Sequence, residues 1–128
     1  MTEIENLGHS GLAIGHEDKL LVCDPWLSRK GAYNASWFPY PHYPHTDWSP
    51  LLGATAVYIS HEHLDHYDPE FVAQLPRDTP ILTGRAYKKR LVSKLRKLGF
   101  ENIIELDNFE SYELAPDFTV RISTPTYK

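Results

Sequence analysis

The sequence predicts an α+β fold in which one mixed β-sheet is covered by helices on one face. Residues 2–23 hold three short apolar runs separated by polar turns that contain glycine, which is typical of an antiparallel meander. From residue 54 onward, short apolar runs alternate with segments of helical character. A single helical layer would leave the other face of such a sheet bare, so we expect a second layer to cover it.

Length and composition limit the class of protein. The 128 residues suffice for one domain with a hydrophobic core. A net charge of −4 argues against nucleic acid or an anionic membrane as the main partner, since both attract clustered Lys and Arg. The single cysteine, Cys23, lies in an apolar run and has no partner for an internal disulfide, which fits a reducing compartment. The N-terminus is acidic and no apolar run approaches the length of a membrane span, so we expect a cytoplasmic protein.

The meander opens the chain. Gly8 and Gly11 mark its first turn, and the third strand ends at Asp24, because Pro25 has no backbone N–H and restricts the residue before it. The strands are expected at residues 2–7, 12–14 and 19–23.

A long loop is expected from residue 28 to residue 50. Prolines at this density forbid a helix or a central strand, and the aromatic content argues against disorder. The aromatic side chains either form a wall or lid over a substrate or pack onto their own domain. The residues concerned are Tyr33, Trp37, Phe38, Tyr40, Tyr43 and Trp48, with Pro39, Pro41, Pro44 and Pro50 between them.

The second part of the chain alternates strands and helices. Asp68 is the expected N-cap of a short helix that begins at Pro69 and runs to about Leu75. A second helix is expected at residues 85–98, ending at Gly99. Strands are expected at residues 54–59, 80–83 and 102–106, followed by a pair at 110–114 and 118–123.

A cluster of potential metal ligands follows the strand at residues 54–59. His61 and His63 are two positions apart, so in an extended backbone both project to the same side and can approach one ion. Asp65 and His66 follow a turn at Leu64 and can bind a second metal ion nearby. Imidazole and carboxylate ligands suit zinc, and also iron or manganese, so the ligands alone leave the metal open.

This motif, residues 61–66 after an apolar strand, resembles the signature of the metallo-β-lactamase superfamily. Residues 7–11 and 21–27 are similar to the opening of a branch that includes the ascorbate-6-phosphate lactonases. The combination of residues 24–27, Trp37, 47–48 and 58–61 more closely resembles the CMP-N-acetylneuraminate hydroxylases. The resemblance implies a four-layer αββα sandwich with the metals at the edge between its sheets. We expect residues 1–128 to form one such domain, of which this chain is the N-terminal half, completed by a C-terminal segment or a second chain.

The resemblance also implies roles for individual residues. His61 and His63 would bind the first metal, Asp65 and His66 the second, and Asp65 would also transfer protons. The family pattern places a further ligand where this sequence has Lys128, and a protonated lysine has no lone pair for a metal. His9 and Asp24 would orient ligands or touch substrate, although a turn histidine and a capping aspartate are equally good interpretations.

Three functions are compatible with these features. The leading hypothesis is a hydrolase that uses metal-activated water on a small anionic or sugar-like molecule, with zinc as the metal and two ions if the missing ligands are supplied. The second is an iron-dependent hydroxylase of the type that acts on sialic acid. The third is a non-catalytic half-domain or binding module.

Overall fold

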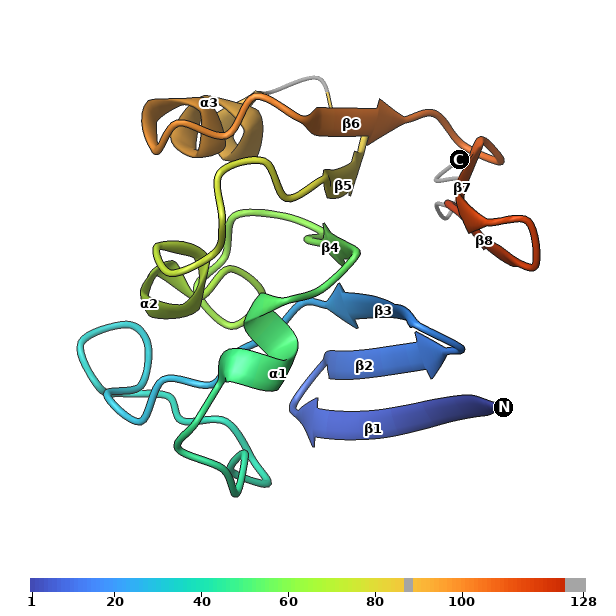
Figure 1. The fold of residues 1–128 in the computed structure, drawn as a ribbon. Coiled ribbons are helices and arrows are strands. Elements are labelled where there is room, and N and C mark those ends of the chain that lie inside the picture. The colour runs from blue at the N-terminus through green and yellow to red at the C-terminus, as the bar shows by residue number, and fades with distance from the viewer. Residues whose placement is uncertain (87–88, 124–128) are drawn as a thin grey trace.

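Three antiparallel strands begin the sheet. The computed structural model describes residues 1–86 and 89–123. The strands β1 (Thr2–Gly8), β2 (Gly11–His16) and β3 (Lys19–Cys23) pair in sequence order, so the predicted meander is confirmed. Figure 1 shows them in blue beside the N-terminus.

Three parallel strands complete the same sheet. These are β4 (Ala56–Tyr58), β5 (Ile81–Gly84) and β6 (Ile103–Leu106), and β4 pairs in parallel with β3. The six strands follow one another in sequence order across the sheet. The parallel pairings require crossover connections, and these carry the helices.

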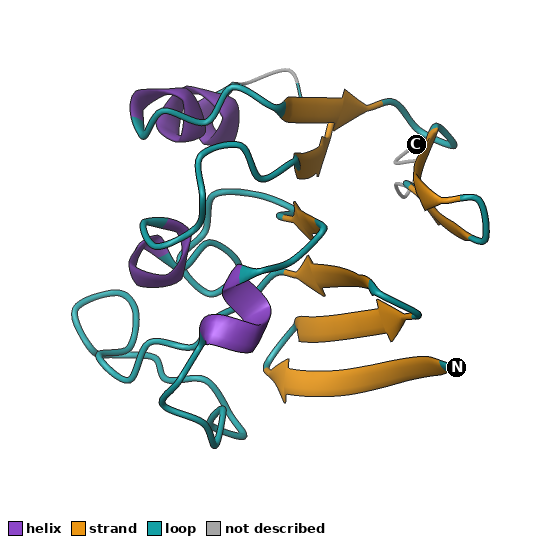
Figure 2. Ribbon diagram, viewed as in Figure 1, coloured by secondary structure: helices purple, strands orange, loops and turns teal. Residues whose placement is uncertain are grey.

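The helices lie together on one side of the sheet (Figure 2). They are α1 (Ser49–Leu52), α2 (Pro69–Val72) and α3 (Arg90–Lys97). Apolar side chains from all three pack against one face of the sheet. This core includes Leu51, Phe71, Val72, Leu91 and Leu95 from the helices and Val22, Val57 and Ile81 from the strands.

The opposite face of the sheet is covered in part by a β-hairpin. The hairpin strands are β7 (Ser111–Ala115) and β8 (Phe118–Arg121). Alternation along the strands sends a second apolar set to this side, and the hairpin packs on it. This smaller core contains Leu21, Ala56 and Leu82, with Phe118 and Val120 from the hairpin against them. The second layer that the sequence predicts is therefore present, at least in part.

The helices differ in detail from the sequence expectations. The loop prediction was wrong at its end, because α1 begins at Ser49; Pro50 fits there, since the first turn of a helix needs no N–H donor. Helix α2 begins where predicted but ends early, because the Gln74 and Leu75 amides bond three residues back and Pro76 lacks an N–H.

Helix α3 starts later than predicted. The Arg85 amide donates to the Leu106 carbonyl, 2.8 Å away, so the backbone there still follows the sheet. The predicted end at Gly99 is confirmed, with the left-handed φ of +100° that glycine tolerates. None of the helices in residues 1–86 and 89–123 is long and apolar enough to cross a membrane.

Candidate metal centre

The candidate site lies at one edge of the sheet, where three strands that run in the same direction end. Strands β1 and β3 both pair antiparallel with β2, and β4 is parallel to β3. Their carboxyl ends therefore meet at the same edge. His9 follows β1, Asp24 follows β3, and residues 60–66 follow β4.

The chain turns sharply where it leaves β1 and β3. His9 and Asp24 both adopt left-handed backbone angles, with φ of 51° and 43°. Gly8 allows the first turn, since its own φ is +99° and a Cβ there would lie 2.2 Å from the Pro41 carbonyl oxygen. The Asp24 amide donates to the Tyr58 carbonyl, 2.8 Å away, which continues the β3–β4 pairing into the site.

Asp24 holds the loop after β4 through three hydrogen bonds. Its carboxylate is buried, with 7% of the residue exposed. One oxygen accepts the Ser60 amide at 2.7 Å. The other accepts the Ser60 hydroxyl at 2.7 Å and Nδ1–H of His66 at 2.9 Å. The interpretation of Asp24 as a turn cap alone therefore misses its contact with His66.

These bonds determine which nitrogen of two imidazoles carries hydrogen. The Ser60 hydroxyl hydrogen goes to Asp24, so its oxygen accepts from Nδ1–H of His61, 2.8 Å away. His66 likewise has its hydrogen on Nδ1. In the neutral form each ring therefore has its lone pair on Nε2, which is what a metal ligand requires.

Asp65 occupies the centre of the cluster and is 8% exposed. His9 Nε2 lies 2.9 Å from its Oδ2, His66 Nε2 lies 3.3 Å from the same oxygen, and the Tyr33 hydroxyl donates to Oδ1 at 3.4 Å. Burial opposes ionisation of Asp65, but the hydrogen bond from His9, a backbone N–H and nearby His66 outweigh it and hold its pKa below the ordinary value. Asp65 is thus a carboxylate at neutral pH.

The imidazoles of His61 and His63 lie beside this centre, with His63 edge to face against His61 and His66 tilted against it. The ring centroid of His61 lies 4.6 Å from that of His63 and 4.2 Å from that of His66. Burial, and the potential positive charges of His66 and His63, lower the pKa of His61. His61 is therefore neutral at pH 7 and has a lone pair to donate.

The donor set fits a divalent cation. His9, Asp65 and His66 offer ligand atoms that all lie within 4.8 Å of one another. His66 Nε2 lies 3.3 Å from Asp65 Oδ2. Two ligand atoms bound to one tetrahedral zinc at ~2.0–2.1 Å are separated by about this distance.

The structure gathers all six residues that the sequence singled out. His61, His63, Asp65 and His66 lie in one loop, and His9 and Asp24 contact them from two other strand ends. His9 is close enough to Asp65 and His66 to be a ligand itself, whereas the sequence suggested only a supporting role.

Two further contributors were missed. Ser60 links Asp24 to His61, and its only sequence signal is its place directly before the histidine motif. Tyr33 reaches Asp65 from the aromatic loop. Lys128, expected at the position of a further ligand, lies outside the described residues.

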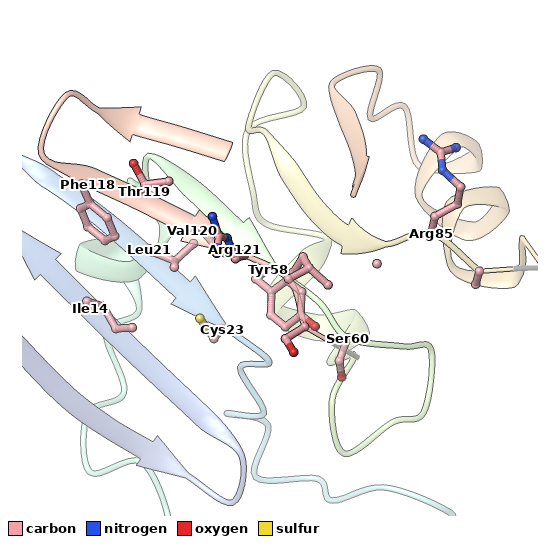
Figure 3. Close-up of a pocket in the computed structure, with 14 residues that line it drawn as sticks. Ile14, Leu21, Cys23, Tyr58, Ser60, Arg85, Phe118, Thr119, Val120 and Arg121 are labelled. Carbon is pink, nitrogen blue, oxygen red and sulfur yellow. The ribbon is translucent and has the colours of Figure 1, made fainter. Parts of the chain in front are cut away.

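A largely apolar cleft of about 750 Å³ lies between the sheet and the hairpin and reaches Ser60 at the candidate site (Figure 3). Ile14, Leu21 and Val120 are among the residues that line it, so it is the space between two packed layers. Cys23 also faces this cleft, where burial, followed by the Asp24 charge, raises its pKa to about 11. A thiol with that pKa stays protonated at neutral pH and is a poor nucleophile.

Comparisons with known proteins agree with this architecture. A protein of Mycolicibacterium smegmatis, named as a candidate Rieske 2Fe-2S iron-sulfur protein, is 36% identical over 104 residues, covering 80% of this chain and 20% of that protein. The cytidine monophosphate-N-acetylneuraminic acid hydroxylase of Cricetulus griseus is 36% identical over 86 residues, covering 64% of this chain and 15% of the hydroxylase. The chain thus spans about a fifth, or less, of the length of these relatives.

A solved structure gives the same result. The crystal structure of a possible metal-dependent hydrolase from Veillonella parvula superposes with a TM-score of 0.65 at 26% identity, covering 94% of this chain and 45% of that one. Residues 3–124 match the β-lactamase superfamily domain. The metallo-β-lactamase-like fold class is therefore confirmed, and the chain belongs to the metallo-β-lactamase superfamily.

Proposed function

We propose that this chain carries the metal-binding part of a metal-dependent hydrolase that acts on a small anionic or sugar-like molecule. One observation carries the proposal. The carboxylate of Asp65 and the imidazoles of His9 and His66 converge at the sheet edge, with ligand atoms within 4.8 Å of one another. A divalent cation can replace the hydrogens shared among these groups, because metal ligands bind in their deprotonated forms. The hydrolase of Veillonella parvula supports the reaction class.

The residues have distinct roles in this proposal. His61 and His63 hold one divalent metal, zinc by preference, while Asp65 and His66 begin a second position. His9 is placed to join the second position or to orient Asp65. Such metals act as Lewis acids and lower the pKa of water to near neutrality. The remaining ligands come from outside the described residues or from a second chain.

The surrounding groups prepare this donor set. Asp24 and Ser60 fix the imidazoles of His61 and His66 with Nε2 free, so little reorganisation is needed when a metal binds. Asp65 is ionised and accepts hydrogen bonds from His9 and Tyr33, which makes it the candidate proton acceptor. Orientation of ligands and proton transfer are thus contributed by this chain's own residues.

A second candidate is an iron-dependent hydroxylase. The hydroxylase of Cricetulus griseus and the relative named for a Rieske centre favour it. Hydroxylation with dioxygen needs outside electrons, which a Rieske centre can carry. A Rieske cluster needs two cysteines and two histidines, and this chain has one cysteine, so that cluster would lie elsewhere.

Metal analysis combined with turnover assays separates the candidates. The chain is loaded with Zn²⁺, Mn²⁺ or Fe²⁺ and offered ester, lactone and phosphoester substrates, and oxygen uptake is followed in parallel. We expect hydrolysis that His63→Ala abolishes and His42→Ala, an exposed loop histidine, leaves intact. Oxygen uptake with iron and no hydrolysis would support the hydroxylase. Absence of metal binding above background would leave only a binding module.

A further inference from the structure

A positively charged groove lies beside the metal centre. It has a volume of about 580 Å³, within the range of small-molecule sites. The residues that line it come from the loop of residues 62–64, from helix α3, and from Tyr33 in the aromatic loop. His63 lines the groove and contacts His61 edge to face, and the Tyr33 hydroxyl also donates to Asp65. The groove therefore adjoins the candidate metal ligands through His63 and Tyr33.

Helix α3 presents a stripe of polar side chains to this groove. Arg90, Ser93, Lys94 and Lys97 line it, at positions i, i+3, i+4 and i+7 of one helical face. Leu91 and Leu95 lie on another face and are buried. The hydrophobic face thus anchors the helix in the core and fixes the direction of the stripe.

The groove carries an excess of positive charge. Three cationic side chains line it, against one carboxylate, that of Glu62. Arg90 approaches Glu62 at 3.8 Å, while the Lys94 ammonium lies 5.5 Å from the centre of the Tyr67 ring. An excess of two positive charges in a chain of net charge −4 is a local concentration that the overall composition does not explain.

We propose that this groove binds a dianionic group of the substrate and so places the rest of the molecule at the metal cluster. The inference rests on the proposed function and names its substrate class. A phosphomonoester carries about −1.5 to −2 charges at pH 7 and offers three acceptor oxygens, which the guanidinium, the ammonium groups and the Ser93 hydroxyl can satisfy. A dicarboxylate shares this chemistry, whereas a neutral ester lacks it.

The test compares two charge reversals on the same helix. Lys97→Glu changes a groove residue, and Arg96→Glu makes the same change in charge one position away, outside the lining of the groove. Both side chains are exposed, so neither change disturbs the core. The full chain, labelled with ¹⁵N and held metal-free, is titrated with inorganic phosphate and separately with succinate, and circular dichroism checks the fold of each variant.

We expect phosphate to shift the amide signals of residues 62–64 and 90–97 in the wild type and in Arg96→Glu. Lys97→Glu should weaken binding roughly tenfold or more, since it replaces an attraction with a repulsion. Tighter binding of phosphate than of succinate assigns a phosphate ester, and the reverse assigns a dicarboxylate. Equal dissociation constants for the two variants, or no binding by the wild type, would overturn the proposal.

These outcomes are independent of turnover. Anion binding in the groove by a chain that hydrolyses nothing would refute the hydrolase and leave the groove in place. For an active protein, Lys97→Glu should raise KM for a phosphorylated ester about tenfold and leave KM for the neutral ester unchanged. If the protein hydrolyses the phosphorylated ester with the same KM in both variants, the anion-binding role of the groove is refuted and the proposed hydrolase activity stands.

Discussion

Replacing Asp24 by asparagine should weaken metal binding without changing any ligand. The substitution preserves shape but turns one carboxylate oxygen into an NH₂ group. If the amide oxygen keeps its bond to the Ser60 amide, the NH₂ faces Nδ1–H of His66, where an acceptor stood at 2.9 Å. The ring must then move its hydrogen to Nε2, and the lone pair that faces Asp65 is lost.

The magnitude follows from these contacts. Loss of a carboxylate that orients a ligating histidine reduces metal affinity by about 10–100-fold. If the side chain instead flips, His66 keeps its acceptor, but the NH₂ group meets the buried Ser60 amide. Two facing donors would then cost roughly 1–3 kcal/mol of folding free energy. Either outcome differs measurably from the wild type.

The measurement is a chelator competition for Co²⁺ or Zn²⁺, paired with urea unfolding of the metal-free chain. Asp117→Asn is the matched control, because it breaks another carboxylate–imidazole contact, His16 Nε2 to Asp117 Oδ2 at 2.6 Å, away from the site. We expect the control to keep wild-type metal affinity. An Asp24→Asn protein that kept both wild-type metal affinity and wild-type stability would refute the orienting role.

Three further predictions concern the scaffold. Asp68→Ala should lower the free energy of unfolding by about 3 kcal/mol, because its carboxylate accepts three backbone N–H groups that join the chain after β3 to the start of α2. Urea unfolding measures this, and a loss below roughly 1 kcal/mol would contradict it. The Cys23 thiol should react with iodoacetamide about 100-fold more slowly at pH 8 than a thiol of pKa 9.0, since a pKa raised to about 11 reduces the thiolate fraction by that factor. Mass spectrometry follows the alkylation, and its rate should rise tenfold per pH unit up to about pH 10. Gly8→Ala should destabilise the fold and displace His9, because its Cβ would overlap the Pro41 carbonyl; an unchanged melting temperature would argue against that contact.

Much of the scaffold could be predicted from local patterns. The eight strands in the described part of the chain match the predicted segments to within two residues at each end, because each combines an apolar run with turn residues at its limits. The cap at Asp68 followed from its place before Pro69, and the structure confirms it through the bond from the Glu70 amide. The predicted start of α3 was wrong, because Arg85, directly after β5, still pairs with the neighbouring strand. That tertiary pairing overrides the helical spacing of the apolar residues.

The sequence by itself determined the family and the local grouping of the potential metal ligands. Histidines and an aspartate spaced closely after a buried strand lie in one loop whatever the rest of the fold does, since their separation is a matter of a few residues. Tertiary structure alone decided what surrounds them. His9 lies 56 positions from Asp65, and Asp24 lies 36 from Ser60. The order of the strands in the sheet brings these residues together in space. The packing of Leu91 and Leu95 into the core orients the cationic face of α3 toward His63. Such contacts depend on which strands become neighbours, and spacing along the chain does not specify this.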